Sequence, residues 1–245
     1  MVKKALSILL VTALLASLFF YAVIELGHNW QWHVLLDFRY KFSFGFMVTL
    51  LISFFSLIGS LILGILAALG RRSKIHFFRY LASIYVEVIR GTPLLVQILV
   101  IFYIIGTAYR LNNRYVMGVM ILSLFAGAYV AEIIRGGLES IPSAQLETAR
   151  SLCFTRGQTY RYIIIPQLSR IVLPPLTSQF ASLVKDSSLL SFIAVNEFTK
   201  VVMEADSLNF ATFENYILLA AGYMLITLPI SWLTKRLERK MQYAT

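Results

Sequence analysis

Long apolar stretches recur along this chain and leave few folds open to it. A helix needs roughly 20 mostly apolar residues to cross about 30 Å of hydrocarbon, and about six stretches reach that length. They run approximately Ala5–Leu26, Phe44–Leu69, Phe77–Ala108, Tyr115–Leu138, Ile163–Val195 and Phe213–Leu233. Only 14% of the residues are charged, whereas soluble domains carry about 25%. The sequence therefore predicts an all-α membrane protein with about six transmembrane helices.

The first stretch has features of a secretory signal. Lys3 and Lys4 precede its apolar run. That run is roughly 20 residues long, beyond the 7–15 of a signal peptide, and no small-x-small cleavage site closes it. We therefore expect residues 1–43 to form an N-terminal transmembrane helix followed by an external linker.

The basic residues indicate an orientation. With the N-terminus inside, most lysines and arginines fall on the cytoplasmic side, as the positive-inside rule requires. The outer side then holds only Arg39, Lys41, Arg110, Arg114 and Lys200. Both termini are expected in the cytoplasm, with residues 238–245 as a tail. The net charge of +10 thus reflects topology, and we expect no nucleic-acid partner.

Signatures of catalysis and of metal binding are absent from the sequence. No G-x-x-x-x-G-K-[ST] loop is present, so the chain is not expected to bind ATP. His28, His33 and His76 lack metal-ligand spacing, and Cys153 is the only cysteine, which excludes an internal disulfide framework. We expect no cofactor, no metal and no enzymatic activity in this chain.

The longest cytoplasmic loop, about residues 139–162, interrupts the apolar pattern. After Pro142 the residues favour helix, with Leu146, Ala149 and Leu152 along one narrow stripe. Glu147 and Arg150 stand at i,i+3, a spacing at which they can pair weakly. A second short helix is expected at about residues 155–162. Two short helices here would protrude as a knob suited to gripping a soluble partner.

The same loop carries a spaced motif. Glu147-Thr148-Ala149 is followed by Cys153 and then by Ile163-Ile164-Ile165-Pro166. Three further segments accompany it in order: YVEVIRGTPLLVQ at 85–97, AYVAEIIRGGLESIPSAQ at 128–145 and LVKDSSLLSFIAV at 183–195. Over roughly residues 46–235 the chain resembles the permease subunits of bacterial ABC importers, in the branch that takes up polar amino acids.

The resemblance implies a fold, a function and partners. The fold would be a five-helix permease core at 44–237 with one added N-terminal helix, in the bacterial inner membrane. Alternating access would move a polar amino acid delivered by an extracytoplasmic binding protein. A second permease subunit, identical or related, and two cytoplasmic ATP-binding subunits would complete the complex, and those ATPases would hydrolyse the ATP.

The loop 139–162 would, by the same resemblance, insert into the ATPase. The residues implied in this coupling are Glu147, Thr148, Ala149, Arg150, Cys153 and Gly157. Thr148 and Cys153 depart from the family motif, which has alanine and glycine there. Glycine suits a left-handed turn, where a side chain costs on the order of 1 kcal/mol. Either the turn is adjusted at Cys153, or the bound ATPase holds it in place.

Two short motifs place charges near the cytoplasmic ends of spans. Glu87 and Arg90, like Glu132 and Arg135, stand at i,i+3 within the form Glu-x-Ile-Arg-Gly. Each glutamate can pair with the arginine on its own helix face. Structural pairing at the interface and a gating role are both open. For Glu132 a place in the substrate pathway is open as well.

Lys185, Asp186, Ser187 and Ser188 lie within the fifth apolar stretch. Ionisable residues inside a span are costly and commonly functional. A cation, an anion and two hydroxyls match the ammonium and carboxylate of an amino acid, which predicts a substrate pathway. The alternative is a structural Lys185–Asp186 pair. Residues 196–211 would either dock a binding protein or close the outer mouth.

Two other functions compete with the importer subunit. An ion-coupled secondary amino-acid transporter would need no ATPase, but such carriers often have larger, internally repeated bundles. A membrane anchor that recruits a cytoplasmic partner would not need charged residues at 185 and 186.

Overall fold

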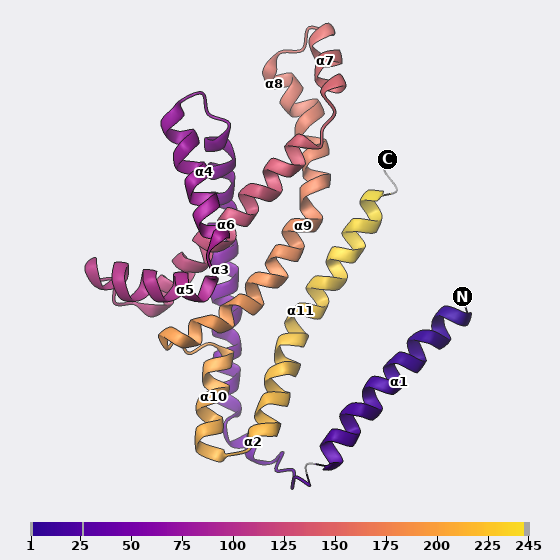
Figure 1. Cartoon of the computed structure of the whole chain (residues 1–245), viewed down its shortest axis with the longest axis vertical. Coiled ribbons are helices and arrows are strands. Elements are labelled where there is room, and N and C mark those ends of the chain that lie inside the picture. Colours follow the sequence, from indigo (N-terminus) through magenta and orange to yellow (C-terminus); the bar gives the residue numbers. More distant parts are fainter. Residues whose placement is uncertain (1, 26, 243–245) are drawn as a thin grey trace.

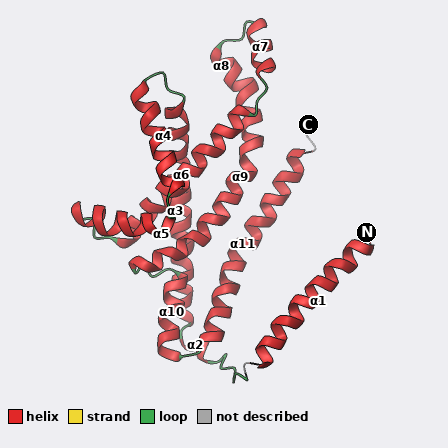
Figure 2. Ribbon diagram, in the orientation of Figure 1, coloured by secondary structure: helices red, strands yellow, loops and turns green. Residues whose placement is uncertain are grey.

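The computed structural model describes residues 2–25 and 27–242, and within those ranges the ordered elements are helices without a strand (Figure 2). The long elements are α1 (Val2–Glu25), α3 (Arg39–Arg71), α6 (Arg114–Glu139), α9 (Ile165–Asp186) and α11 (Thr212–Gln242). The shorter ones are α2 (Val34–Asp37), α4 (His76–Gly91), α5 (Leu94–Leu99), η1 (Val100–Gly106), α7 (Ser143–Ser151), α8 (Arg156–Thr159), η2 (Tyr160–Ile164), η3 (Ser187–Ile193) and α10 (Phe198–Asn209). The expected all-α class is confirmed.

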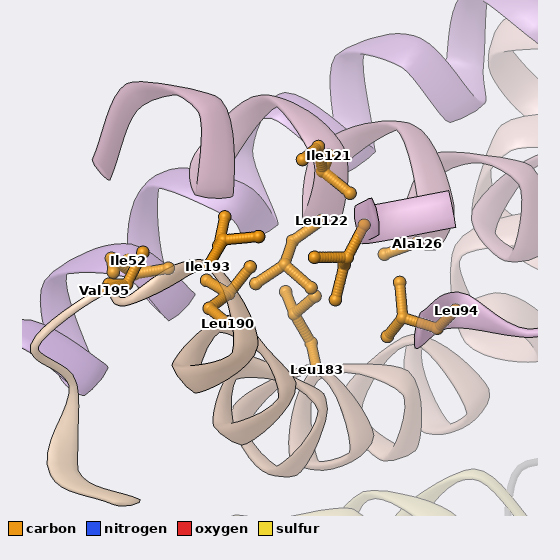
Figure 3. Packing of buried hydrophobic residues seen from close by; sticks show 10 residues of the cluster. Ile52, Leu94, Ile121, Leu122, Ala126, Leu183, Leu190, Ile193 and Val195 are labelled. Carbon is orange, nitrogen blue, oxygen red and sulfur yellow. The ribbon is translucent and has the colours of Figure 1, made fainter. Parts of the chain in front are cut away.

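Helices α3 and α6 form the centre of the bundle. Small residues let α3 and α6 approach each other closely, because a Cβ added to Gly64 would collide with Val130 and one added to Gly59 would collide with Ser123. Small residues at helix interfaces are the usual means of tight packing in a bilayer. The apolar core beside this pair joins α3, α5, α6, α9 and η3 (Figure 3).

The third expected span, Phe77–Ala108, is not a straight helix. Its two parts, α4 and α5 with η1, meet at 113°. Pro93 supplies no N–H and disfavours helical backbone at the preceding residue, and Thr92 is indeed extended. The Gln97 side chain donates to the Ile89 carbonyl at 2.7 Å, which satisfies an acceptor freed by the break.

The fifth expected span also changes course before its end. Regular α9 stops at Asp186, and a 3-10 segment continues to Ile193 before Ala194 turns left-handed. Among the described residues, three helices are long and apolar enough to cross a membrane, or four if the bent α4–α5 pair is one span. The expected number of six therefore stays a prediction.

The two ends of the bundle differ in what they carry. The pair α7 and α8 and the α3–α4 turn lie toward one end, and α2 and α10 lie at the other (Figure 1). Helix α11 runs beside α9, whereas α1 stands apart from the bundle. The expected placing of both termini on the cytoplasmic side stays a prediction.

Candidate functional site

The loop between α6 and α9 folds into the expected knob, with α7 and α8 projecting from the bundle (Figure 1). Ala149 is the buried member of its apolar stripe at 1% exposed, while Leu152 faces outward. Glu147 and Arg150 are exposed, and the weak pair expected between them is not formed in the described structure. Both charged groups are therefore free to meet a partner.

Cys153 occupies a left-handed turn, with φ of 56°. Its N–H donates to the Arg150 carbonyl at 2.9 Å, and the Phe154 N–H donates to the Ala149 carbonyl at 3.0 Å. These two bonds are the Schellman motif that ends many helices. Of the two expected alternatives, adjustment of the turn is wrong. The chain keeps the conformation that suits glycine and places a cysteine in it.

A capping box starts α8. The Thr155 hydroxyl accepts from the Gln158 N–H, and the Gln158 side chain accepts from the Thr155 N–H at 2.8 Å. Gly157 lies exposed within this turn. Gln167 of α9 donates to the Gln145 side chain of α7 at 2.7 Å. This hydrogen bond ties the knob to the helix that follows it.

Glu132 is the centre of a charged cluster at the same end of the bundle. Its carboxylate meets Arg71 of α3 at 2.8 Å, Arg90 of α4 at 3.5 Å and Arg135 of its own helix. Arg135 also pairs with Glu139. The cluster joins the ends of three helices, so it braces them against one another.

The structure corrects one of the two expected ion pairs. Glu132 and Arg135 do pair. Glu87 is exposed and makes no ion pair in the part of the chain that the structure describes, and Arg90 turns to Glu132 instead. Arg90 lies 5.5 Å from the Tyr129 ring centre, in a cation–π position, and this contact with α6 holds it on the Glu132 side.

A cavity of about 540 Å³ opens beside Glu132. Arg90, Tyr129 and Glu132 form one wall, and Ser178, Gln179 and Ser182 of α9 form another. The cavity is thus lined by charges of both signs and by hydroxyl and amide groups. Its size and lining suit a small polar molecule.

The expected pathway residues continue along α9 from this cavity. Asp186 follows Ser182 by one helical turn and is half-buried, and Lys185 is exposed. Neither forms an ion pair within the described residues, so the alternative of a Lys185–Asp186 brace is wrong here. Ser188 donates to the Lys185 carbonyl at 2.7 Å. Ser187 is fully buried and donates to the Val184 carbonyl at 2.8 Å, so its hydroxyl does not face a pathway.

A buried carboxylate escaped the sequence analysis. Glu197 is 0% exposed and caps α10 by accepting from the backbone N–H groups of Thr199 and Lys200, at 2.9 and 2.8 Å. The hydroxyl of Tyr223 in α11 donates to it at 2.9 Å, and that of Thr49 in α3 lies at 3.5 Å. The only sequence signal was a glutamate directly before a helix, the position of an N-cap.

The rest of the segment 196–211 is held by surface charges. Glu204 of α10 pairs with Lys41 of α3 at 2.8 Å and lies 3.7 Å from Lys200. The hydrogen bond from Lys41 is the main cause that keeps the pKa of the Glu204 carboxyl below its usual value. Helix α10 is therefore fastened to α3 at both its buried and its exposed side.

Fold and site together define a bundle of apolar helices suited to a membrane, from which the knob of α7 and α8 projects. The chain belongs to the family of binding-protein-dependent transport system inner membrane components, which matches residues 60–243. It is a multi-pass inner-membrane protein and an ABC importer permease, and the expected resemblance to that family is confirmed.

Individual relatives cover most of the chain. The probable glutamine ABC transporter permease GlnM of Bacillus subtilis is 37% identical, over 80% of this chain and 92% of its own. The glutamine permease GlnP of Escherichia coli K12 is 36% identical, over 81% and 91%. The L-cystine permease TcyB of Bacillus subtilis is 36% identical, over 81% and 86%.

Solved structures of ABC transporters also resemble this chain. A chain from an amino acid ABC transporter with histidines superposes with a TM-score of 0.81 at 36% identity, over 87% of this chain and all of that one. A chain of the MetNI methionine transporter reaches a TM-score of 0.65 at 16% identity, over 84% and 98%, a likeness of fold alone. The ion-coupled carrier is not favoured by these findings.

Proposed function

We propose that this chain moves a polar amino acid across the inner membrane as one permease subunit of an ATP-driven importer. The observation that carries the proposal is the likeness, across 87% of the chain, to a solved amino acid ABC transporter. The relatives named for glutamine and cystine support a polar amino acid as the substrate. A binding protein delivers the substrate, and alternating access carries it across.

The coupling to ATP takes place at the knob. Glu147 and Arg150 are exposed and unpaired within the described structure, and the motif residues Thr148, Ala149, Cys153 and Gly157 shape the turn around them. Closure of two partner ATPases pushes on α7. The Gln145–Gln167 bond and the direct connection through η2 pass the displacement to α9. ATP is hydrolysed on the partners.

The substrate passes along one face of α9. Lys185, Asp186 and Ser188 meet the amino acid first, and the cavity beside Glu132 receives it nearer the cytoplasm. The charges of both signs in these two places support the assignment, because a zwitterion needs a donor and an acceptor at once. Arg90 and Arg135 hold Glu132 and close the inner end until the helices separate.

Six spans and cytoplasmic termini complete the proposal. Residues 1–43 form the added helix and linker, 44–237 the permease core with the knob at 139–162, and 238–245 the tail. A second permease subunit pairs with the core. Helix α11 ends toward the side that carries α7 and α8, which supports a common side for the knob and the C-terminal end of α11 (Figure 1).

Reconstitution tests the function. The chain is co-purified with its candidate ATPases and placed in liposomes with the binding protein, and uptake of labelled glutamine and cystine is measured with and without ATP. We expect uptake only with ATP. Failure to bind any ATPase would contradict the proposal. An ATPase complex that takes up neither glutamine nor cystine would also contradict it and would favour the membrane anchor.

A further inference from the structure

An apolar groove of about 560 Å³ lies between α3 and α4, near the turn that joins them. Its walls include Leu63, Leu66 and Leu69 of α3 and Phe78 and Leu81 of α4. From Leu63 to Gly70 the groove follows α3 for about 10 Å, at 1.5 Å per residue. Leu66 and Leu81 are 59% and 55% exposed, so the groove is open on the outer side of the bundle.

The mouth of this groove is cationic. Gly70 and Ser73 border it, and Arg72 and Lys74 of the connecting turn are exposed and have no ion pair in the described structure. The sequence has no Asp or Glu between residues 70 and 86. Arg71 is already engaged by Glu132. Two free cations thus stand at one end of an apolar slot.

The neighbouring surface of α4 is apolar as well. Phe77, Tyr80 and Ile84 of α4 are exposed, and exposed aromatic residues such as Tyr80 are typical of the boundary between headgroups and acyl chains. Ser73 accepts the Ile75 N–H at 3.1 Å, which fixes the turn that presents Arg72 and Lys74. The site is therefore shaped before any ligand arrives.

We propose that this groove binds one anionic phospholipid from the leaflet on the α7–α8 side. Its phosphate lies between Arg72 and Lys74, and an acyl chain fills the groove. A peptide segment would bring unpaired backbone N–H and C=O groups into an apolar slot, which a hydrocarbon chain does not. A zwitterionic lipid would bring an ammonium toward two cations. Lipid recognition at this site goes beyond transport and needs no ATPase.

Titration of the full-length chain tests the site. Dioleoyl phosphatidylglycerol and dioleoyl phosphatidylethanolamine are titrated into the detergent-purified chain, and bound lipid is counted by native mass spectrometry. We expect tighter retention of phosphatidylglycerol. The double change R72Q/K74Q should weaken it roughly thirtyfold, because each cation near an anionic headgroup contributes about a fivefold factor.

A matched double change separates a site from diffuse attraction. Lys235 and Arg236 are also exposed cations. They belong to the last part of α11, which runs toward the α7–α8 side (Figure 1), and K235Q/R236Q should change retention less than twofold. Equal losses in both double variants, or no loss in R72Q/K74Q, would overturn the proposal. L66W fills the groove from its exposed side and should abolish retention at unchanged melting temperature. Undiminished retention in L66W would overturn the acyl-chain placement.

Discussion

Cys153 is a residue with a Cβ at a position whose left-handed backbone conformation favours glycine. Its two Schellman hydrogen bonds are complete, so the turn is made by the chain itself and does not wait for a bound ATPase. The strain of a left-handed residue with a Cβ, on the order of 1 kcal/mol, is thereby carried in the isolated subunit. The sequence located this position by its motif but could not decide whether the turn would change.

Replacing Cys153 by glycine should relieve that strain. We expect the Cys153→Gly amides at positions 153 and 154 to exchange with solvent about fivefold more slowly, which corresponds to about 1 kcal/mol. Hydrogen exchange read by mass spectrometry measures this, and uptake should be unchanged. Cys153→Ala keeps the Cβ and serves as the control. Equal slowing of hydrogen exchange in both variants would contradict the inference that relief of backbone strain causes the effect.

Asp186 is the residue on which the pathway depends most. Asp186→Ala should lower ATP-dependent uptake roughly 10- to 100-fold, since a charge-assisted hydrogen bond contributes about 1.5–3 kcal/mol, while the complex still assembles. Initial uptake rates in liposomes measure the loss. Asp37→Ala, on the exposed α2, is the control with the same change of charge. Full transport by Asp186→Ala would remove Asp186 from the pathway.

At the scale of the element, α7 is the part of the knob that meets the ATPase. Glu147→Arg should weaken binding of the ATPase about thirtyfold, as expected for a central interface contact of about 2 kcal/mol. Affinity is measured on immobilised permease complexes. Asp37→Arg reverses a charge at the opposite end of the bundle and should have no effect. An unchanged affinity in Glu147→Arg would show that another segment makes the contact.

Glu197 fastens α10 to α3 and α11 by accepting from buried donors. Glu197→Ala leaves the two backbone N–H groups of α10 without their acceptor and reduces the Tyr223 hydroxyl to its contact with Thr199, and we expect the free energy of unfolding to fall by about 3 kcal/mol. Unfolding in mixed SDS micelles measures it. Glu204→Ala removes partly exposed pairs with Lys41 and Lys200 and should cost less than about 1 kcal/mol. A similar loss of unfolding free energy in the two variants would contradict the inference that burial makes the Glu197 contacts the stronger ones.

The elements differ in how far the sequence determined them. The length of the apolar runs located α3, α6 and α11, and the loop composition located α7 and α8. The bend before α5 had a local signal, Thr92-Pro93, which the continuous apolar run concealed. Partners of Glu132 were not readable, because Arg71 and Arg90 reach it from other helices and only packing brings them there. Burial of Glu197 likewise depends on helices far away along the chain.

For the whole molecule, the orientation is the property to test. Cys153 is exposed and is the only cysteine, so a membrane-impermeant maleimide should leave it unlabelled in intact spheroplasts and label it after lysis. In a Cys153→Ser background, Ser207→Cys of α10 should label in intact spheroplasts, since Ser207 is exposed at the other end. Labelling of Cys153 before lysis would reverse the proposed topology.

The cluster around Glu132 makes the molecule unequally tolerant of change. Three arginines share one carboxylate, so losing Arg71 or Arg90 leaves the acid with other partners. Losing Glu132 leaves Arg71, Arg90 and Arg135 close together at the junction of three helices without the carboxylate that they share. Substitutions should therefore accumulate readily at each arginine taken singly and hardly at all at position 132. Each arginine can be replaced because the other two still neutralise Glu132, whereas no second carboxylate among the described residues takes the place of Glu132 for Arg71 and Arg90.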